Sequence, residues 1–177
     1  MKNYISMFIM IIVGFVLQTT VFRELQIASV SPNILVILTV ISGTMYGQYN
    51  GLFAGTICGL LVDLLYSSVI GVNIFIYAVV GFIAGMTNKV YIEDDFIFPM
   101  ITIAVGDLIY GVLFYALKFL LRGRLDFLDY IINTILPEAI YTIIVGIFVF
   151  KFAHWLDEKL NPPTEVRLGV ESKFSDD

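Results

Sequence analysis

Long apolar runs, separated by short polar breaks, occupy most of the chain. The first run covers residues 4–22 and, at about 19 residues, is long enough to cross a bilayer as a helix. It exceeds the roughly 7–15 residues of a cleavable signal-peptide core, so we expect a retained first helix. Five further runs follow, at residues 33–46, 51–66, 71–88, 96–121 and 129–150. Because none has the period-two alternation of barrel strands, the pattern predicts an all-α polytopic membrane protein, a bundle of about six transmembrane helices.

The composition agrees with lipid as the solvent for most of the chain. Of the 177 residues, 59% are hydrophobic and 14% are charged, and the mean hydropathy is +0.91, whereas an ordinary soluble domain is roughly 45–50% apolar. The polar stretch 161–177 begins with Asn161-Pro162-Pro163, which breaks a helix. We therefore expect a transmembrane domain over residues 1–160 and a disordered polar cytoplasmic tail over residues 161–177.

Six crossings place both termini on the same side of the membrane. With the N-terminus in the cytoplasm, six of the ten Lys and Arg residues lie inside, and positive charge favours the inside. The basic cluster between Lys118 and Arg124 argues for the opposite orientation. On balance we expect both termini to be cytoplasmic.

Two of the runs, 33–46 and 51–66, are shorter than the roughly 20 residues that span a bilayer. They must extend into their flanks or lie where the bundle protects them. Pro32 and Asn33 form a good helix start, because proline costs nothing at an early helical position. The segment Gly47-Gln48-Tyr49-Asn50-Gly51 predicts a tight turn between two antiparallel helices.

Glycine recurs at every fourth position through the third run. The series consists of Gly47, Gly51, Gly55 and Gly59, and Asp63 follows at the same interval. On a helix this interval puts small residues on one face, where another helix backbone can approach closely. Gly81 and Gly85 form a second pair of this kind, so we expect the third and fourth helices to pack tightly, against each other or against neighbours. Asp63 is either a polar residue that reaches the headgroup region or a buried one that fixes a helix or partner by a hydrogen bond.

Two further acidic residues lie deep in apolar runs. Asp107 and Glu138 are each about ten residues into their run, which places them near the middle of the membrane, where an exposed carboxylate is costly. Glu138 follows Pro137, which can kink the helix, and it shares a face with Thr142. We expect both acids to point inward, protonated or hydrogen-bonded; candidate neighbours are Asn133, Tyr110 and Tyr141. A structural polar cluster, a proton or solute pathway and partner binding remain open as roles.

The sequence lacks the residue patterns of common catalytic sites. It contains no HExxH zinc motif, no Walker loop and no GxSxG nucleophile motif. The single histidine, His154, stands beside Trp155 where the last run leaves the membrane, and the single cysteine, Cys58, lies inside an apolar run. The net charge of −5 argues against a nucleic-acid partner. We expect no enzymatic activity, no metal and no cofactor.

Several of these residues together resemble the MreD family of rod shape-determining membrane proteins. The resemblance rests on Pro32-Asn33 at the start of a hydrophobic helix, on the glycine-spaced hairpin that ends Gly59-Leu60-Leu61-Val62-Asp63, and on Gly71-Val72-Asn73 before the helix with Gly81 and Gly85. It covers roughly residues 4–159. The charged tail and the pair Asp107 and Glu138 do not match a family pattern.

This resemblance implies a non-enzymatic membrane scaffold of the bacterial elongation (rod) complex, the elongasome, which supports lateral peptidoglycan synthesis and rod cell shape. The implied location is the bacterial cytoplasmic (inner) membrane. The implied partners are membrane lipid, an MreC-like single-pass membrane protein and, through it, MreB and RodA with its penicillin-binding transpeptidase. If the glycine face docks the partner, Gly55→Leu or Gly59→Leu should break co-purification.

The MreD family is also similar to the substrate-binding components of energy-coupling-factor vitamin transporters. The alternative function is therefore a substrate-binding membrane component of a vitamin or small-molecule transporter, although similarity of fold is weak evidence of function. Under this alternative a vitamin or lipid should stabilise the folded protein in a concentration-dependent way.

Overall fold

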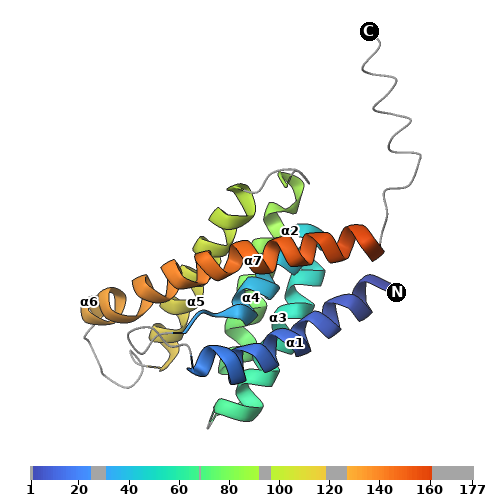
Figure 1. Cartoon of the computed structure of the whole chain (residues 1–177). Helices are drawn as coiled ribbons and strands as arrows, with labels where there is room; N and C mark the ends of the chain where they lie inside the picture. Colours follow the sequence, from blue (N-terminus) through green and yellow to red (C-terminus); the bar gives the residue numbers. More distant parts are fainter. Residues whose placement is uncertain (1, 25–30, 68, 92–96, 119–126, 161–177) are drawn as a thin grey trace, which may run out of the picture.

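The computed structural model describes residues 2–24, 31–67, 69–91, 97–118 and 127–160, and every regular element in these ranges is helical (Figure 1). The elements are α1 (Lys2–Glu24), α2 (Ile34–Tyr46), α3 (Gln48–Tyr66), α4 (Val72–Met86), the 3₁₀ turn η1 (Thr87–Lys89), α5 (Ile97–Lys118), α6 (Phe127–Tyr130), the π-helical η3 (Ile131–Ile135) and α7 (Leu136–Leu160). Within the described ranges, four helical segments are long and apolar enough to cross a membrane, and α1 and α2 add two shorter apolar stretches. The predicted all-α polytopic membrane fold is confirmed.

Helix α2 forms the centre of the bundle. It has 13 residues, and every residue from Ile34 to Thr44 is buried. Helices α1, α3, α4, α5 and α7 all pack against it and follow one another around it in that order. At about 1.5 Å per residue, α2 is about 20 Å long, shorter than the roughly 30 Å hydrocarbon core. Its short length is tolerated because other helices shield its ends from lipid.

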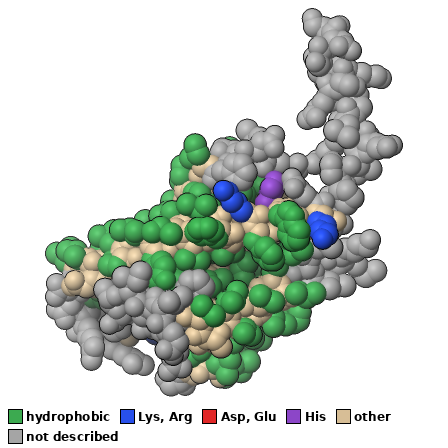
Figure 2. Space-filling view, viewed as in Figure 1, with side chains coloured by type: hydrophobic (Ala, Val, Ile, Leu, Met, Phe, Trp, Pro, Cys, Tyr) green, Lys and Arg blue, Asp and Glu red, His purple; other side chains and the backbone are tan. Residues whose placement is uncertain are grey.

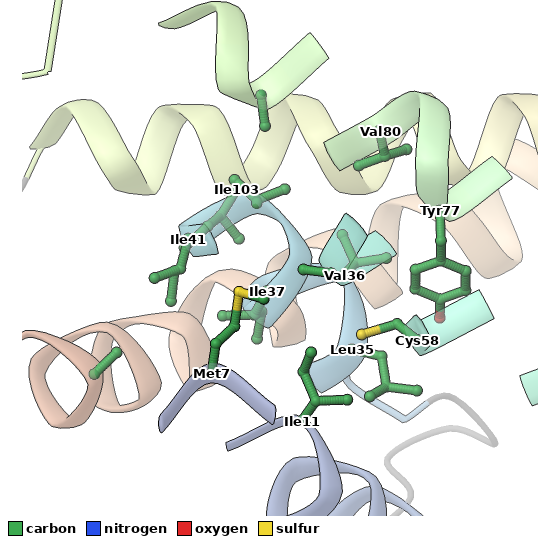
Figure 3. Close-up of a cluster of buried hydrophobic side chains, with 14 of the residues drawn as sticks. Met7, Ile11, Leu35, Val36, Ile37, Ile41, Cys58, Tyr77, Val80 and Ile103 are labelled. Carbon is green, nitrogen blue, oxygen red and sulfur yellow. The ribbon is translucent and has the colours of Figure 1, made fainter. Parts of the chain in front are cut away.

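The apolar core surrounds this central helix. Leu35, Val36 and Ile37 of α2 lie among buried side chains of α1, α4 and α5, which include Ile11, Tyr77 and Ile103 (Figure 3). The outer faces of the surrounding helices are also apolar, with Leu64, Ile101 and Phe148 exposed, and hydrophobic side chains cover much of the visible surface (Figure 2). A bundle that is apolar both inside and outside is the arrangement that lipid solvation requires.

The predicted turn over residues 47–51 is wrong in its length. Gly47 alone separates α2 from α3, with a φ of 92° that favours glycine, and Gln48, Tyr49 and Asn50 already belong to α3. The Asn50 side-chain amide donates to the Tyr46 carbonyl oxygen (2.6 Å), and the Asn88 amide donates to the Thr44 carbonyl oxygen (2.7 Å). These amides satisfy carbonyl groups at the end of α2, so one residue suffices for the reversal.

The first and last helices begin and end at the same end of the bundle (Figure 1). Helix α7 continues ten residues beyond the apolar run that ends at residue 150 and ends at Leu160, just before Asn161-Pro162-Pro163. The Lys159 ammonium lies 4.9 Å from the centre of the Trp155 ring. The expected tail over residues 161–177 lies outside the described residues and stays a prediction. We call the end that carries the α1 start and the α7 end the terminal end, and the other the distal end.

Candidate functional site

The glycines of α3 bring its backbone directly against the backbone of α4. A Cβ atom added at Gly51 would collide with the Gly81 carbonyl oxygen, and one at Gly55 with the Tyr77 carbonyl oxygen. At Gly59 the added atom would lie 2.5 Å from the Ile74 Cα. Backbone atoms cannot move aside as a flexible side chain can, so only glycine permits this helix spacing.

The same interface uses the predicted glycines of α4. A Cβ at Gly81 would meet the Gly51 carbonyl oxygen, and one at Gly85 would meet the Gln48 Cα. Gly43 of α2 joins them, because its Cβ would lie 2.7 Å from the Gly81 carbonyl oxygen. Gly47 serves the turn instead of this face. The structure thus places the glycine series between α2, α3 and α4, where a partner protein has no access to it.

Asp63 anchors the start of α4. Its side chain is fully buried, and its two carboxylate oxygens accept hydrogen bonds from the Gly71 backbone N–H (2.8 Å), the Asn73 backbone N–H (3.3 Å) and the Ile74 backbone N–H (3.1 Å). The Asn73 side-chain amide adds a fourth bond (2.8 Å). Free N–H groups at a helix start carry partial positive charge, so a carboxylate stabilises them well. Of the two roles considered for Asp63, the structure shows the buried one, fixing a helix of its own chain.

Asn33 connects three helices at the distal end. Its side-chain oxygen accepts from the Val36 backbone N–H (3.2 Å), which caps α2, and from the Tyr77 hydroxyl of α4 (2.9 Å). Its backbone N–H donates to the Thr142 hydroxyl of α7 (3.1 Å). The preceding Pro32 is buried and, having no N–H, leaves no donor unsatisfied there. The predicted helix start is therefore also a contact between segments that are far apart in the sequence.

Asp107 and Glu138 come close together between α5 and α7. Asp107 is 2% exposed and lies beside the Thr142 hydroxyl, and Glu138 lies beside the Asn33 side chain. The two carboxyl groups are near enough for their charges to act on each other. Asn133, one of the neighbours considered from the sequence, is exposed instead. Both acids belong to the polar contacts around Asn33, and within the described residues no group of three His, Cys, Asp or Glu could hold a metal.

A π-helical turn precedes Glu138, which the sequence analysis did not foresee. It covers Ile131–Ile135, and the Leu136 N–H donates to the Ile131 carbonyl oxygen, five residues back. Pro137 follows directly and has no N–H to continue an α-helical pattern. Such turns are frequent at functional sites, and Glu138 lies three residues beyond the end of this one.

A cavity of about 480 Å³ opens at the distal end, and Glu138 lies in its wall. Every crossing helix contributes to it, through side chains that include Gln18 of α1, Asn33 before α2, Tyr66 of α3, Asn73 and Tyr77 of α4, and Tyr110, Phe114 and Lys118 of α5. Its volume is within the range of small-molecule sites, roughly 300–1,000 Å³. Polar groups of opposite charge, Glu138 and Lys118, line a space within an otherwise apolar bundle.

Sequence reasoning did not single out several residues of this cavity. Two of them are Tyr77 and Gln18. The Tyr77 ring lies against that of Tyr110, which the sequence analysis had named, with 5.0 Å between ring centres and the planes tilted by 55°. Gln18 accepts a hydrogen bond from the Leu35 backbone N–H (3.1 Å). The one available signal was their polarity within apolar runs, which favours a side that faces protein. Polarity alone does not identify the side chain or backbone group that each residue contacts, because those groups lie on other helices.

Comparison with known proteins identifies one family. The family model for the rod shape-determining protein MreD matches residues 1–157, which is most of the chain. No curated protein and no solved structure matches the chain. The matched range includes the glycine interface, Asp63, Asn33 and all residues of the cavity.

Proposed function

The chain belongs to the MreD family of rod shape-determining proteins, and we propose that it serves this role as a non-enzymatic scaffold of the elongation complex. In this proposal it lies in the bacterial cytoplasmic membrane with both termini in the cytoplasm. It binds an MreC-like single-pass protein and, through it, MreB and the RodA transpeptidase machinery. The observation that carries the proposal is the family match over residues 1–157.

The packing of the bundle supports a scaffold that is rigid before it meets a partner. Because α3 and α4 touch backbone to backbone, and because Asn33 joins α2, α4 and α7, the helices are held in fixed relative positions. A rigid body loses little conformational entropy on binding. The partner must then use a face that the chain leaves uncovered.

The outer faces of α3, α5 and α7 offer three such surfaces. Their exposed side chains include Phe53 of α3, Leu108 of α5 and Ile140 of α7. Each points away from the core, so a larger side chain there leaves the fold intact. It would, however, obstruct a transmembrane helix that packs on the same face.

The test is affinity capture of the full-length protein from native membranes with one tryptophan placed on each face. We expect an MreC-like single-pass protein to co-purify with the wild type and to be lost with only one or two of Phe53→Trp, Leu108→Trp and Ile140→Trp. The faces that tolerate tryptophan are the matched controls. Recovery of no single-pass protein with the wild type would contradict the proposal.

The polar cavity favours a second candidate, the small-molecule-binding component of a transporter. A space of about 480 Å³ with both a carboxylate and an ammonium group suits a polar ligand. Thermal unfolding of the purified protein with a panel of vitamins tests it. A water-soluble ligand that raises the midpoint with concentration, and is taken up by cells only when the protein is present, would favour transport over the scaffold.

A further inference from the structure

The cavity at the distal end contains two opposite charges at different depths. Tyr110, Phe114 and Lys118 line it at intervals of four residues, so they form one stripe from the middle of α5 to its end. Glu138 is close enough to Tyr110 to act on it electrostatically. The Lys118 side chain folds back, and its ammonium lies 4.6 Å from the centre of the Phe114 ring. Tyr110 and Phe114 are about one helical turn apart along α5, so the carboxylate beside Tyr110 lies deeper in the bundle than the ammonium beside Phe114.

The lining of the cavity offers hydrogen-bond acceptors. The Asn73 side chain is 1% exposed and lines the cavity, and its amide oxygen has no hydrogen-bond partner within the described residues. Together with the Glu138 carboxyl group, it places acceptor oxygens in the lining of the cavity. A buried polar atom without a partner is costly. A primary ammonium, which has three N–H donors, fits this wall, whereas a quaternary ammonium has none to give.

Helices α1 and α7 both contribute side chains to the cavity. Helices α1 and α7 meet near the terminal end, where Met7 and Ile11 pack in one cluster with Phe150 and Ala153. From there the two helices diverge toward α6 (Figure 1). Phe15 of α1 and Glu138 of α7 both line the cavity. The lining thus combines apolar and charged side chains, which suits a molecule that has both acyl chains and a polar head.

We infer that the cavity binds the phosphoethanolamine group of a membrane phospholipid, with the ammonium on Glu138 and the phosphate on Lys118. Two carbons separate these charges in the ligand, and the residues beside their counterparts, Tyr110 and Phe114, are about one helical turn apart along α5. The apolar side chains of Phe15, Leu35 and Val62, which also line the cavity, suit the glycerol and the first acyl carbons. This inference does not depend on the scaffold role, because it concerns a ligand and no protein partner.

The test uses full-length protein in nanodiscs that contain phosphatidylethanolamine, phosphatidylcholine and phosphatidylglycerol in equal amounts. Native mass spectrometry after release counts the lipids that stay bound. We expect phosphatidylethanolamine to be enriched on the wild type, and Glu138→Gln and Lys118→Gln each to lower the enrichment about tenfold, the effect of one charged hydrogen bond. Lys151→Gln, which changes an exposed lysine of α7 outside the cavity, should leave the enrichment unchanged.

The outcomes are distinct. Equal retention of the three lipids, preference for phosphatidylcholine, or enrichment that survives both cavity variants would overturn the inference. A melting curve for each variant shows whether it is folded. If Glu138→Gln does not fold, the enrichment of phosphatidylethanolamine on Lys118→Gln, a change at the end of α5, still tests the inference. A separate arm adds free phosphoethanolamine to protein in detergent; stabilisation by this compound without retention of the lipid would also overturn the assignment to a phospholipid.

Discussion

Single polar side chains fix the ends of helices in this bundle. Asp63 accepts four hydrogen bonds from the start of α4, and Asn33 caps α2 while it holds α4 and α7. In lipid there is no water to replace a lost partner, so each such side chain contributes more than an exposed helix cap. The polar residues of the apolar runs are therefore the positions at which the helix ends are fixed.

Asp63→Ala should destabilise the protein. The change leaves the backbone N–H groups of Gly71, Asn73 and Ile74 without their acceptor, and we expect a loss of about 2–4 kcal/mol. Asp63→Asn keeps an acceptor oxygen, so its free energy of unfolding should fall by less. Thermal unfolding in detergent measures both against Lys151→Ala, an exposed control. An Asp63→Ala variant as stable as this control would show that the carboxylate does not anchor α4.

At the scale of elements, the contact between α3 and α4 determines the shape of the bundle. Gly51, Gly55 and Gly59 put one backbone on another, and no side chain separates them. This contact also explains why the glycine face cannot dock a partner in the folded protein. A loss of co-purification in Gly55→Leu would report a damaged fold, so it no longer tests partner binding.

One methyl group suffices to test this contact. Gly55→Ala places a Cβ against the Tyr77 carbonyl oxygen, and we expect it to cost about 1–3 kcal/mol, because two backbones must separate. The matched control is Gly146→Ala in α7, whose Cβ would lie 3.4 Å from the Ile103 Cδ1, an ordinary contact. Differential scanning calorimetry should show a lower midpoint of thermal unfolding for Gly55→Ala than for the wild type, and an unchanged midpoint for Gly146→Ala. Equal midpoints would mean that α3 and α4 are not in backbone contact.

The sequence predicted the helices and their close packing because both depend on local information. An apolar run of a given length must be a helix in lipid, and glycines four apart must share a face. The hydrogen bond between Asn33 and Thr142 joins residues 109 positions apart, and no local pattern of residues predicts it. The single-residue link at Gly47 depends on a hydrogen bond from the Asn88 side chain, which is distant in the sequence, and the cavity exists only once every helix is in place.

At the scale of the whole molecule, the element order fixes which loops share a side of the membrane. The start of α3 lies at the terminal end, and Ser67 follows the end of α3 at the distal end. In a Cys58→Ala background, cysteines at Asn50 and Ser67 should therefore react with a membrane-impermeant maleimide from opposite sides. Labelling of both from one side of intact cells would contradict the six-crossing arrangement.

The central claim is that a bundle held by its glycine interface supports rod shape in the membrane. Depletion of the protein from a rod-shaped bacterium that depends on it, followed by complementation, tests this claim most directly. We predict that depleted cells become round, that the wild type and Gly146→Ala restore rods at equal membrane levels, and that Gly55→Ala does not. Cells that stay rod-shaped throughout depletion, or rods restored as fully by Gly55→Ala as by Gly146→Ala, would contradict the account.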